Sequence, residues 1–226
     1  MRKLESRRQR EKLGLLVCEG EDLVGAALDA GLQPVEALLD AERPVLDERL
    51  PGAERVAPEL LAGASTLAHP ARVVAVFRRT DLPRGVERPL GLALWHVADP
   101  GNVGTLVRTA DALGPAFVAL SPGCGDPTGP KALRASAGAI FRVPLAAFDE
   151  APRPRVGLVV AEGRPLPELE LGERVTFVLG AERGGLPAEA AAACDELATI
   201  PLEPGAESLN VAAAGAVALY ELRRRR

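Results

Sequence analysis

Residues 90–120 read LGLALWHVADPGNVGTLVRTADALGPAFVAL, and this stretch decides the fold class. Its two ends, 90–95 and 117–120, are apolar runs typical of buried strands. Between them, residues 99–101 predict a turn, and apolar positions at helical spacing predict a helix over 103–113. A strand, a helix and a strand in this order predict one unit of a parallel α/β sheet.

The alternation of strands and helices continues toward the C-terminus. Further strands are expected at 156–161, 175–179 and 198–200, and further helices at 130–137, 188–193 and 209–225. Apolar strands that alternate with helices predict a parallel sheet covered on both faces. Ligands of such sheets bind at the loops beyond the carboxyl ends of the strands. We therefore expect the functional residues in the loops 96–104, 180–187 and 201–210.

The first third of the chain predicts a smaller α/β unit. Strands at 15–18 and 35–39 flank a helix that ends at Gly31, and another strand is expected at 71–79. The polar segment 81–89 contains two prolines and predicts a linker. We expect an N-terminal domain over 1–83, a linker over 84–89 and a second domain over 90–226.

Composition excludes several classes of protein. The 226 residues are 47% hydrophobic and 26% charged, which is typical of a soluble globular protein. No apolar run reaches the roughly 18 residues of a membrane span, and the N-terminus lacks the apolar core of a signal peptide. Cys18, Cys124 and Cys194 are odd in number and have no CxxC spacing, which argues against a disulfide framework and a zinc site. We expect a cytoplasmic protein without a metal or a membrane partner.

The net charge of −4 conceals basic regions. Basic residues dominate positions 1–12, and arginines fill 223–226, so each end is either a basic arm that binds nucleic acid or a solvated helix end. Residues 131–145, KALRASAGAIFRVPL, form an edge that could face RNA or solvent, with Lys131, Arg134 and Arg142. His69 and His96 have no partner motif, and we expect both to be structural.

The chain has two asparagines, Asn102 and Asn210, and both lie in the expected loops. Asn102 could cap the following helix, or act at a site with Arg108, six residues further on. Free N–H groups at such a helix start favour an anion such as an RNA phosphate. Neither GxGxxG nor GK[ST] occurs, which argues against dinucleotide enzymes and P-loop NTPases.

The other two loops are also ambiguous by themselves. Residues 177–187, FVLGAERGGLP, run from a strand into a glycine loop whose acidic member is Glu182, and an ordinary exposed turn would look the same. Ser208 could be a plain helix cap. Beyond it, the small residues around Gly215 predict a helix face suited to close packing.

Together the motifs resemble a known family. Asn-x-Gly-x-x-x-Arg-x-Ala at 102–110, Gly-x-Glu-x-x-Gly-Leu at 180–186, and Ile-Pro…Glu-Ser-Leu-Asn-Val at 200–211 resemble the three signature motifs of the SpoU (TrmH-type) ribose methyltransferases of the SPOUT superfamily. The resemblance covers about residues 90–222. Residues 128–145 resemble the members that modify ribosomal RNA, and CEGEDLVGAAL at 18–28 resembles their small substrate-binding domain.

The resemblance implies an α/β fold with a trefoil-knotted C-terminal domain, a homodimer, and S-adenosylmethionine bound in the knot. It implies catalytic roles for Arg108, Asn102, Glu182, Ser208 and Asn210. It implies that the cofactor contacts Leu179, Gly180, Gly185, Ile200, Leu202, Ser208 and Leu209. Arg183 departs from the pattern, since many members have glycine there.

The expected reaction is methyl transfer to a ribose 2′-hydroxyl of RNA, ribosomal RNA more than tRNA. Because a guanidinium stays protonated in proteins, we expect Arg108 to bind a phosphate and stabilise the developing alkoxide rather than act as a base. The alternatives are a tRNA 2′-O-methyltransferase, a non-catalytic RNA-binding dimer of the same fold, and an unrelated nucleotide-binding α/β protein.

Overall fold

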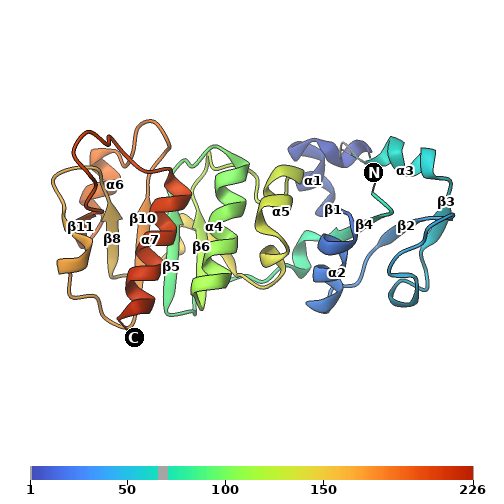
Figure 1. The fold of residues 1–226 in the computed structure, drawn as a ribbon, viewed down its shortest axis with the longest axis horizontal. Helices are drawn as coiled ribbons and strands as arrows, with labels where there is room; N and C mark the ends of the chain where they lie inside the picture. The colour runs from blue at the N-terminus through green and yellow to red at the C-terminus, as the bar shows by residue number, and fades with distance from the viewer. Residues whose placement is uncertain (1, 66–70, 226) are drawn as a thin grey trace.

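The computed structural model of the chain describes residues 2–65 and 71–225. Within these residues the strands form two sheets at opposite ends of an elongated molecule (Figure 1). His69, which we expect to be structural, lies outside the described residues. In the described part of the chain, no helix is both long enough and apolar enough to cross a bilayer.

The smaller sheet contains the N-terminal strands in the order β1-β4-β2-β3. Strand β4 pairs antiparallel with β1 and β2, whereas β2 and β3 are parallel. These strands are β1 (Leu15–Glu19), β2 (Glu36–Asp40), β3 (Glu54–Val56) and β4 (Val73–Arg78), and the accompanying helices are α1 (Arg7–Leu13), α2 (Glu21–Asp29) and α3 (Pro58–Ala64).

The larger sheet has seven strands in the order β7-β6-β5-β10-β8-β11-β9, and every neighbouring pair is parallel. The predicted parallel α/β fold is therefore confirmed. The strands are β5 (Leu90–Leu94), β6 (Ala116–Leu120), β7 (Leu145–Ala147), β8 (Arg155–Leu158), β9 (Arg164–Pro165), β10 (Val175–Leu179) and β11 (Glu196–Thr199), and the helices are α4 (Pro100–Leu113), α5 (Pro130–Ser136), α6 (Ala188–Ala192) and α7 (Val211–Arg224).

The central strands are buried on both faces, as their unbroken apolar sequence predicts. In β10, Phe177 and Leu179 belong to one hydrophobic cluster and Val178 belongs to another, on the opposite face of the sheet. Helices α4 and α7 lie together over one face (Figure 1). Gly215 allows this close packing, because a Cβ there would lie 2.4 Å from Leu106 of α4.

Two helices begin at positions other than those expected from the sequence. Asp99 caps α4 by accepting a hydrogen bond from the Asn102 N–H (3.0 Å), so the interpretation of Asn102 as the cap is wrong. Pro100 fits the first helical turn because its missing N–H needs no partner there. Asn210, and not Ser208, caps α7, because its Oδ1 accepts from the N–H groups of Ala212 and Ala213.

Some basic residues of the termini are packed against the molecule, whereas Arg8, Lys12, Arg223 and Arg224 are exposed. Arg10 of α1 is 4% exposed and forms an ion pair of 2.7 Å with Asp126 of the loop before α5. At the other end, Arg224 and Arg225 pair with Glu221. Arg225 also donates to the carbonyl groups of Leu166 and Leu169.

The Arg10–Asp126 pair joins the N-terminal part of the chain to the larger sheet. Burial raises the pKa of Asp126, but hydrogen bonds from Thr128 and Arg10 outweigh it and leave this pKa below its ordinary value. The pair therefore stabilises the fold at pH values above the unfolded pKa of about 3.9. This contribution is lost as the pH falls through the lower folded pKa.

Arg10→Met is expected to lower the free energy of unfolding by about 3–5 kcal/mol, because the buried carboxylate of Asp126 then has no charge partner. Urea unfolding measures the loss. The matched control is Arg8→Met on the exposed face of α1, which should change stability by less than about 0.5 kcal/mol. Equal effects of the two substitutions would contradict the role of the ion pair.

Candidate active site

Three loops meet beyond the carboxyl ends of the strands of the larger sheet. One loop joins β5 to α4, the second follows β10, and the third joins β11 to α7. Strands β5 and β10 are direct neighbours, so their loops start side by side. The loop before α7 returns to them because α7 packs against α4 and β10.

The side chain of Glu182 connects the first two loops. Its Oε1 accepts hydrogen bonds from Asn102 Nδ2 (3.0 Å) and the Asp99 N–H (3.1 Å), and its Oε2 accepts one from the Ala98 N–H (3.2 Å). A carboxylate suits this place because it accepts several hydrogen bonds and donates none. Glu182 therefore holds the start of α4 against the glycine loop after β10.

Asn210 connects the third loop to the same cluster. Its Nδ2 donates to Asn102 Oδ1 (3.2 Å), while its own Oδ1 caps α7. Each asparagine thus uses both ends of its amide, and neither aspartate nor leucine could replace it in these contacts. The chain's two asparagines and Glu182 form one network, which we call the loop network.

The loop network favours an ionised Glu182. Partial burial raises the pKa of Glu182, but hydrogen bonds outweigh this effect and leave the pKa below its usual value. The largest comes from Asn102, followed by those from backbone N–H groups, including Asp99 and Ala98. Glu182 is therefore a hydrogen-bond acceptor at neutral pH and not a proton donor.

Asp99 is a site residue that the sequence analysis missed. Lys131 Nζ lies 2.5 Å from its Oδ2, and this hydrogen bond, with those from the Asn102 and Gly101 N–H groups, lowers the pKa of Asp99 despite desolvation. The signal in the sequence was the Asp-Pro pair, which is a typical cap followed by a first helical residue. Asp99 fixes the helix start that carries Asn102.

A cleft of about 170 Å³ lies beside the loop network. Its walls include all seven positions at which the sequence predicts cofactor contacts: Leu179, Gly180, Gly185, Ile200, Leu202, Ser208 and Leu209. Nothing in the sequence indicated that Leu158, the last residue of β8, and the two residues after it line the same cleft. Strand β8 lies beside β10, so its carboxyl end opens into the same cleft. Arg183 lies on the cleft wall, and Ser208 lines the cleft without capping the helix.

Glycine is required where the two sides of the glycine loop approach each other. A Cβ on Gly180 would lie 2.0 Å from the carbonyl carbon of Gly185, so a side chain cannot be accommodated without moving backbone. Ala181 and Gly185 exchange backbone hydrogen bonds of 3.1 and 2.9 Å across the loop. The cleft wall there is therefore bare backbone, which a ligand can approach closely.

Arg108 is not part of the loop network. It is exposed on α4 and does not line the cleft, and its side chain makes no hydrogen bond or ion pair with the described residues. Six residues separate it from Asn102, which at about 100° per residue turns its direction by about 120° around the helix. Its guanidinium is available to a partner on the open side of α4.

The predicted basic edge is only partly available. Lys131 is held by Asp99, and Arg142 is held by Asp111, with its Nη2 2.5 Å from Asp111 Oδ2. Arg134 is exposed, and its side chain has no hydrogen bond or ion pair with the part of the chain that the structure describes. Binding of RNA by these residues stays a prediction.

His96 and the cysteines lie apart from this chemistry. The His96 ring stacks on Trp95 with centroids 5.0 Å apart, and its backbone N–H donates to Ser121 Oγ (2.9 Å). All three cysteines are unpaired. Within residues 2–65 and 71–225, no three His, Cys, Asp or Glu side chains form a group that could hold a metal ion.

Comparisons with known proteins agree with this architecture. The profile of the SpoU rRNA Methylase family matches residues 89–220. The chain is 33% identical to an uncharacterized tRNA/rRNA methyltransferase of Synechocystis, over 99% of this chain and 89% of the relative. It is 30% identical to a 23S rRNA (guanosine-2′-O)-methyltransferase of Bacillus subtilis, over 98% and 94%.

Two crystal structures with bound AdoMet have the same fold along the whole chain. The SpoU methyltransferase AviRb of Streptomyces viridochromogenes superposes with a TM-score of 0.84 at 25% identity, covering 99% of this chain and 94% of that protein. An rRNA methyltransferase of Sinorhizobium meliloti superposes with a TM-score of 0.86 at 27% identity, covering 99% and 92%.

Proposed function

The chain belongs to the SpoU methylase family, and we propose on that premise that it transfers a methyl group from S-adenosylmethionine to a ribose 2′-hydroxyl of RNA. The observation that carries the proposal is the cleft beside the loop network, into which all the expected cofactor positions open. Ribosomal RNA is the preferred substrate, since the Bacillus subtilis relative is a 23S rRNA methyltransferase.

The residues of the cleft fit S-adenosylmethionine. Leu158, Ile200 and Leu209 supply apolar walls for an adenine ring, and the bare backbone at Gly180 and Gly185 supplies hydrogen-bonding groups. When bound there, the sulfonium of S-adenosylmethionine supplies an electrophilic methyl group. The loop network keeps the three walls of the cleft in register before either substrate arrives, so less ordering is needed on binding.

We assign the polar residues two different tasks. Glu182, Asn102 and Asn210 position the loops, because their hydrogen-bonding groups are already used within the protein. Ser208 and Arg108 make no such bonds and can contact RNA. A permanently charged guanidinium at Arg108 can bind a phosphate and stabilise the negative charge that develops on the 2′-oxygen.

We also propose a homodimer in which the partner protomer helps to complete the site. The cleft is open, and the loop 201–210 is exposed along its whole length. Two apolar side chains of the cleft wall are exposed, Val160 (69%) and Leu209 (40%). Tyr220 on α7 is also exposed (57%). The direction of Arg108, turned away from Asn102, agrees with a site assembled from two chains.

Three further assignments belong to the same proposal. We divide the chain into an RNA-binding domain (1–83), a linker (84–89) and a trefoil-knotted methyltransferase domain (90–226). The separate small sheet supports the division. A cytoplasmic location agrees with the unpaired cysteines. The alternative substrate is tRNA. The alternative function is RNA binding without turnover, and a radiolabelled methyl-transfer assay on bulk RNA distinguishes it from the proposed enzyme.

Arg108→Ala is expected to lower methyl transfer to bulk RNA by at least about 100-fold, because the charge that develops on the 2′-oxygen loses its stabilising partner. Binding of S-adenosylhomocysteine, followed by calorimetry, should stay within about twofold because Arg108 does not line the cleft. Arg174→Met, which replaces an exposed arginine directly before the amino end of β10, is the control. An Arg108→Ala enzyme with most of its turnover would contradict this role.

Gly180→Ala is expected to weaken S-adenosylhomocysteine binding by about tenfold or more, because its methyl group would overlap the backbone of Gly185 and displace the cleft wall. Gly184→Ala in the same loop is the control, since a Cβ there meets no atom within 4 Å. Calorimetric titration of both variants tests the placement of the ligand. Equal affinities would show that it binds elsewhere.

A further inference from the structure

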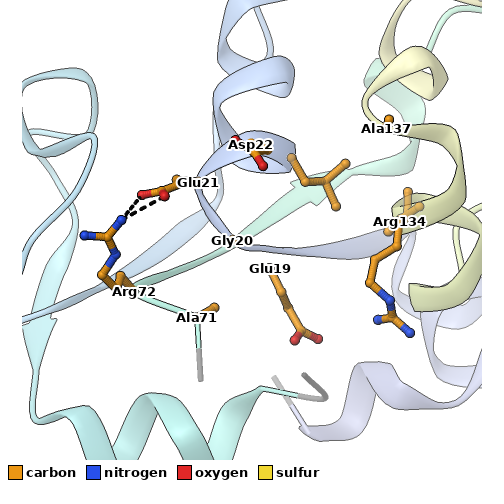
Figure 2. Close-up of a pocket in the computed structure, with 10 residues that line it drawn as sticks. Glu19, Gly20, Glu21, Asp22, Ala71, Arg72, Arg134 and Ala137 are labelled. Carbon is orange, nitrogen blue, oxygen red and sulfur yellow. Dashed lines mark hydrogen bonds and ion pairs between the residues drawn. The ribbon is translucent and has the colours of Figure 1, made fainter. Parts of the chain in front are cut away.

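A second cavity lies between the small sheet and α5, outside the cleft described above (Figure 2). It measures about 430 Å³, within the range of small-molecule pockets. Its floor is apolar and includes Leu23, Ala71 and Leu133, all buried. Elements of both sheet regions contribute to it, so it exists only when the two ends of the chain are docked together.

The rim of this cavity carries charges of both signs. Arg72 is neutralised by Glu21, to which its Nη2 donates hydrogen bonds of 2.8 and 2.6 Å. The guanidinium of Arg134 makes no hydrogen bond or ion pair with the described residues. Figure 2 shows the side chains of Arg134 and Glu19 extending to the same side, with their charged ends facing a common space. Ser65 Oγ donates to Glu19 Oε2 (2.8 Å) and helps to fix this carboxylate.

Helix α5 connects this cavity to the candidate active site. Lys131, in its first turn, contacts Asp99 at the start of α4, and Arg134 follows one helical turn later, on the neighbouring face of the helix. Three residues of helix advance about 4.5 Å. An RNA chain that follows α5 away from the active site therefore reaches this cavity.

Resting on the proposed function, we propose that this cavity binds a guanine base of the RNA chain that carries the methylated nucleotide. Guanine presents O6 and N7 as a pair of acceptors, which arginine recognises with two hydrogen bonds. Its N1–H and amino group form a pair of donors, and the two oxygens of a carboxylate can accept their hydrogen bonds. Arg134 and Glu19 supply both partners across an apolar floor. Cytosine and uracil have no N7, and adenine has an amino group in place of O6.

Unstacked bases in single-stranded segments are the usual targets of sequence-specific RNA binding. The cavity therefore contributes base selection, while the cleft binds the methyl donor. It assigns a specificity role to Arg134, whose charge is not used for packing. It also explains why the two ends of the chain are joined by a buried ion pair, since their relative position fixes the distance between base and active site.

The test titrates each of the four nucleoside 5′-monophosphates into the full-length protein with S-adenosylhomocysteine present, followed by ligand-observed NMR. GMP is expected to bind at least about fivefold more tightly than AMP, CMP or UMP. Arg134→Met and Glu19→Gln should each weaken GMP binding by about fivefold or more, and Arg174→Met should not change it. Thermal unfolding verifies that each variant is folded, and Arg134→Met, at an exposed position, decides the question if Glu19→Gln is unstable.

Equal affinity for all four nucleotides, or GMP binding that survives Arg134→Met, would overturn the proposal. The same samples separate it from the proposed function. If S-adenosylhomocysteine does not stabilise the wild-type protein, the methyltransferase assignment fails. If it does so but GMP is not selected, only the base-binding cavity is refuted.

Discussion

The carboxylate of Glu182 is the interaction on which the site depends. A parallel sheet brings the carboxyl ends of its strands to the same side, but it does not hold the loops beyond them in place. Here one ionised side chain from the loop after β10 accepts hydrogen bonds from two backbone N–H groups and from Asn102. Asn210 then links Asn102 to the start of α7. Three distant segments thereby share one set of hydrogen bonds.

This arrangement separates positioning from chemistry. The residues that hold the loops have their polar groups occupied by other parts of the chain, whereas Arg108, Ser208 and Arg134 remain available to an RNA partner. Lys131 belongs to the first group, because Asp99 holds it at the start of α4. The same helix α5 leads to the loop of Asp126, where Arg10 connects the N-terminal region. Contacts through α5 and its preceding loop thus connect the N-terminal region to the site.

The sequence predicted the parts of the fold that local patterns determine. Unbroken apolar runs identified β5, β6 and β10, because strands buried on both faces show no alternation. It missed the edge strands β7 and β9, which are short and partly exposed. The sequence also did not predict the strand order β5-β10-β8-β11, because strand neighbours depend on packing between segments far apart in the chain.

The site shows the same division. The motifs identified Asn102, Glu182 and Asn210, but not that they contact one another, nor that Asp99 and not Asn102 caps α4. The sequence could not predict the burial of Arg10, because its partner Asp126 is 116 residues away. A charge-rich terminus looks the same whether it is solvated or docked, and only the partner distinguishes the two.

The most direct test of the loop network is amide hydrogen exchange in Glu182→Gln, compared with Glu203→Gln at an exposed position of the third loop. Loss of the charged acceptor should accelerate exchange at Ala98 and Asp99 by about tenfold or more, and exchange at Ala212 should rise with it. Acceleration confined to residues 180–187, with the other two loops unchanged, would contradict the claim that one carboxylate holds all three together.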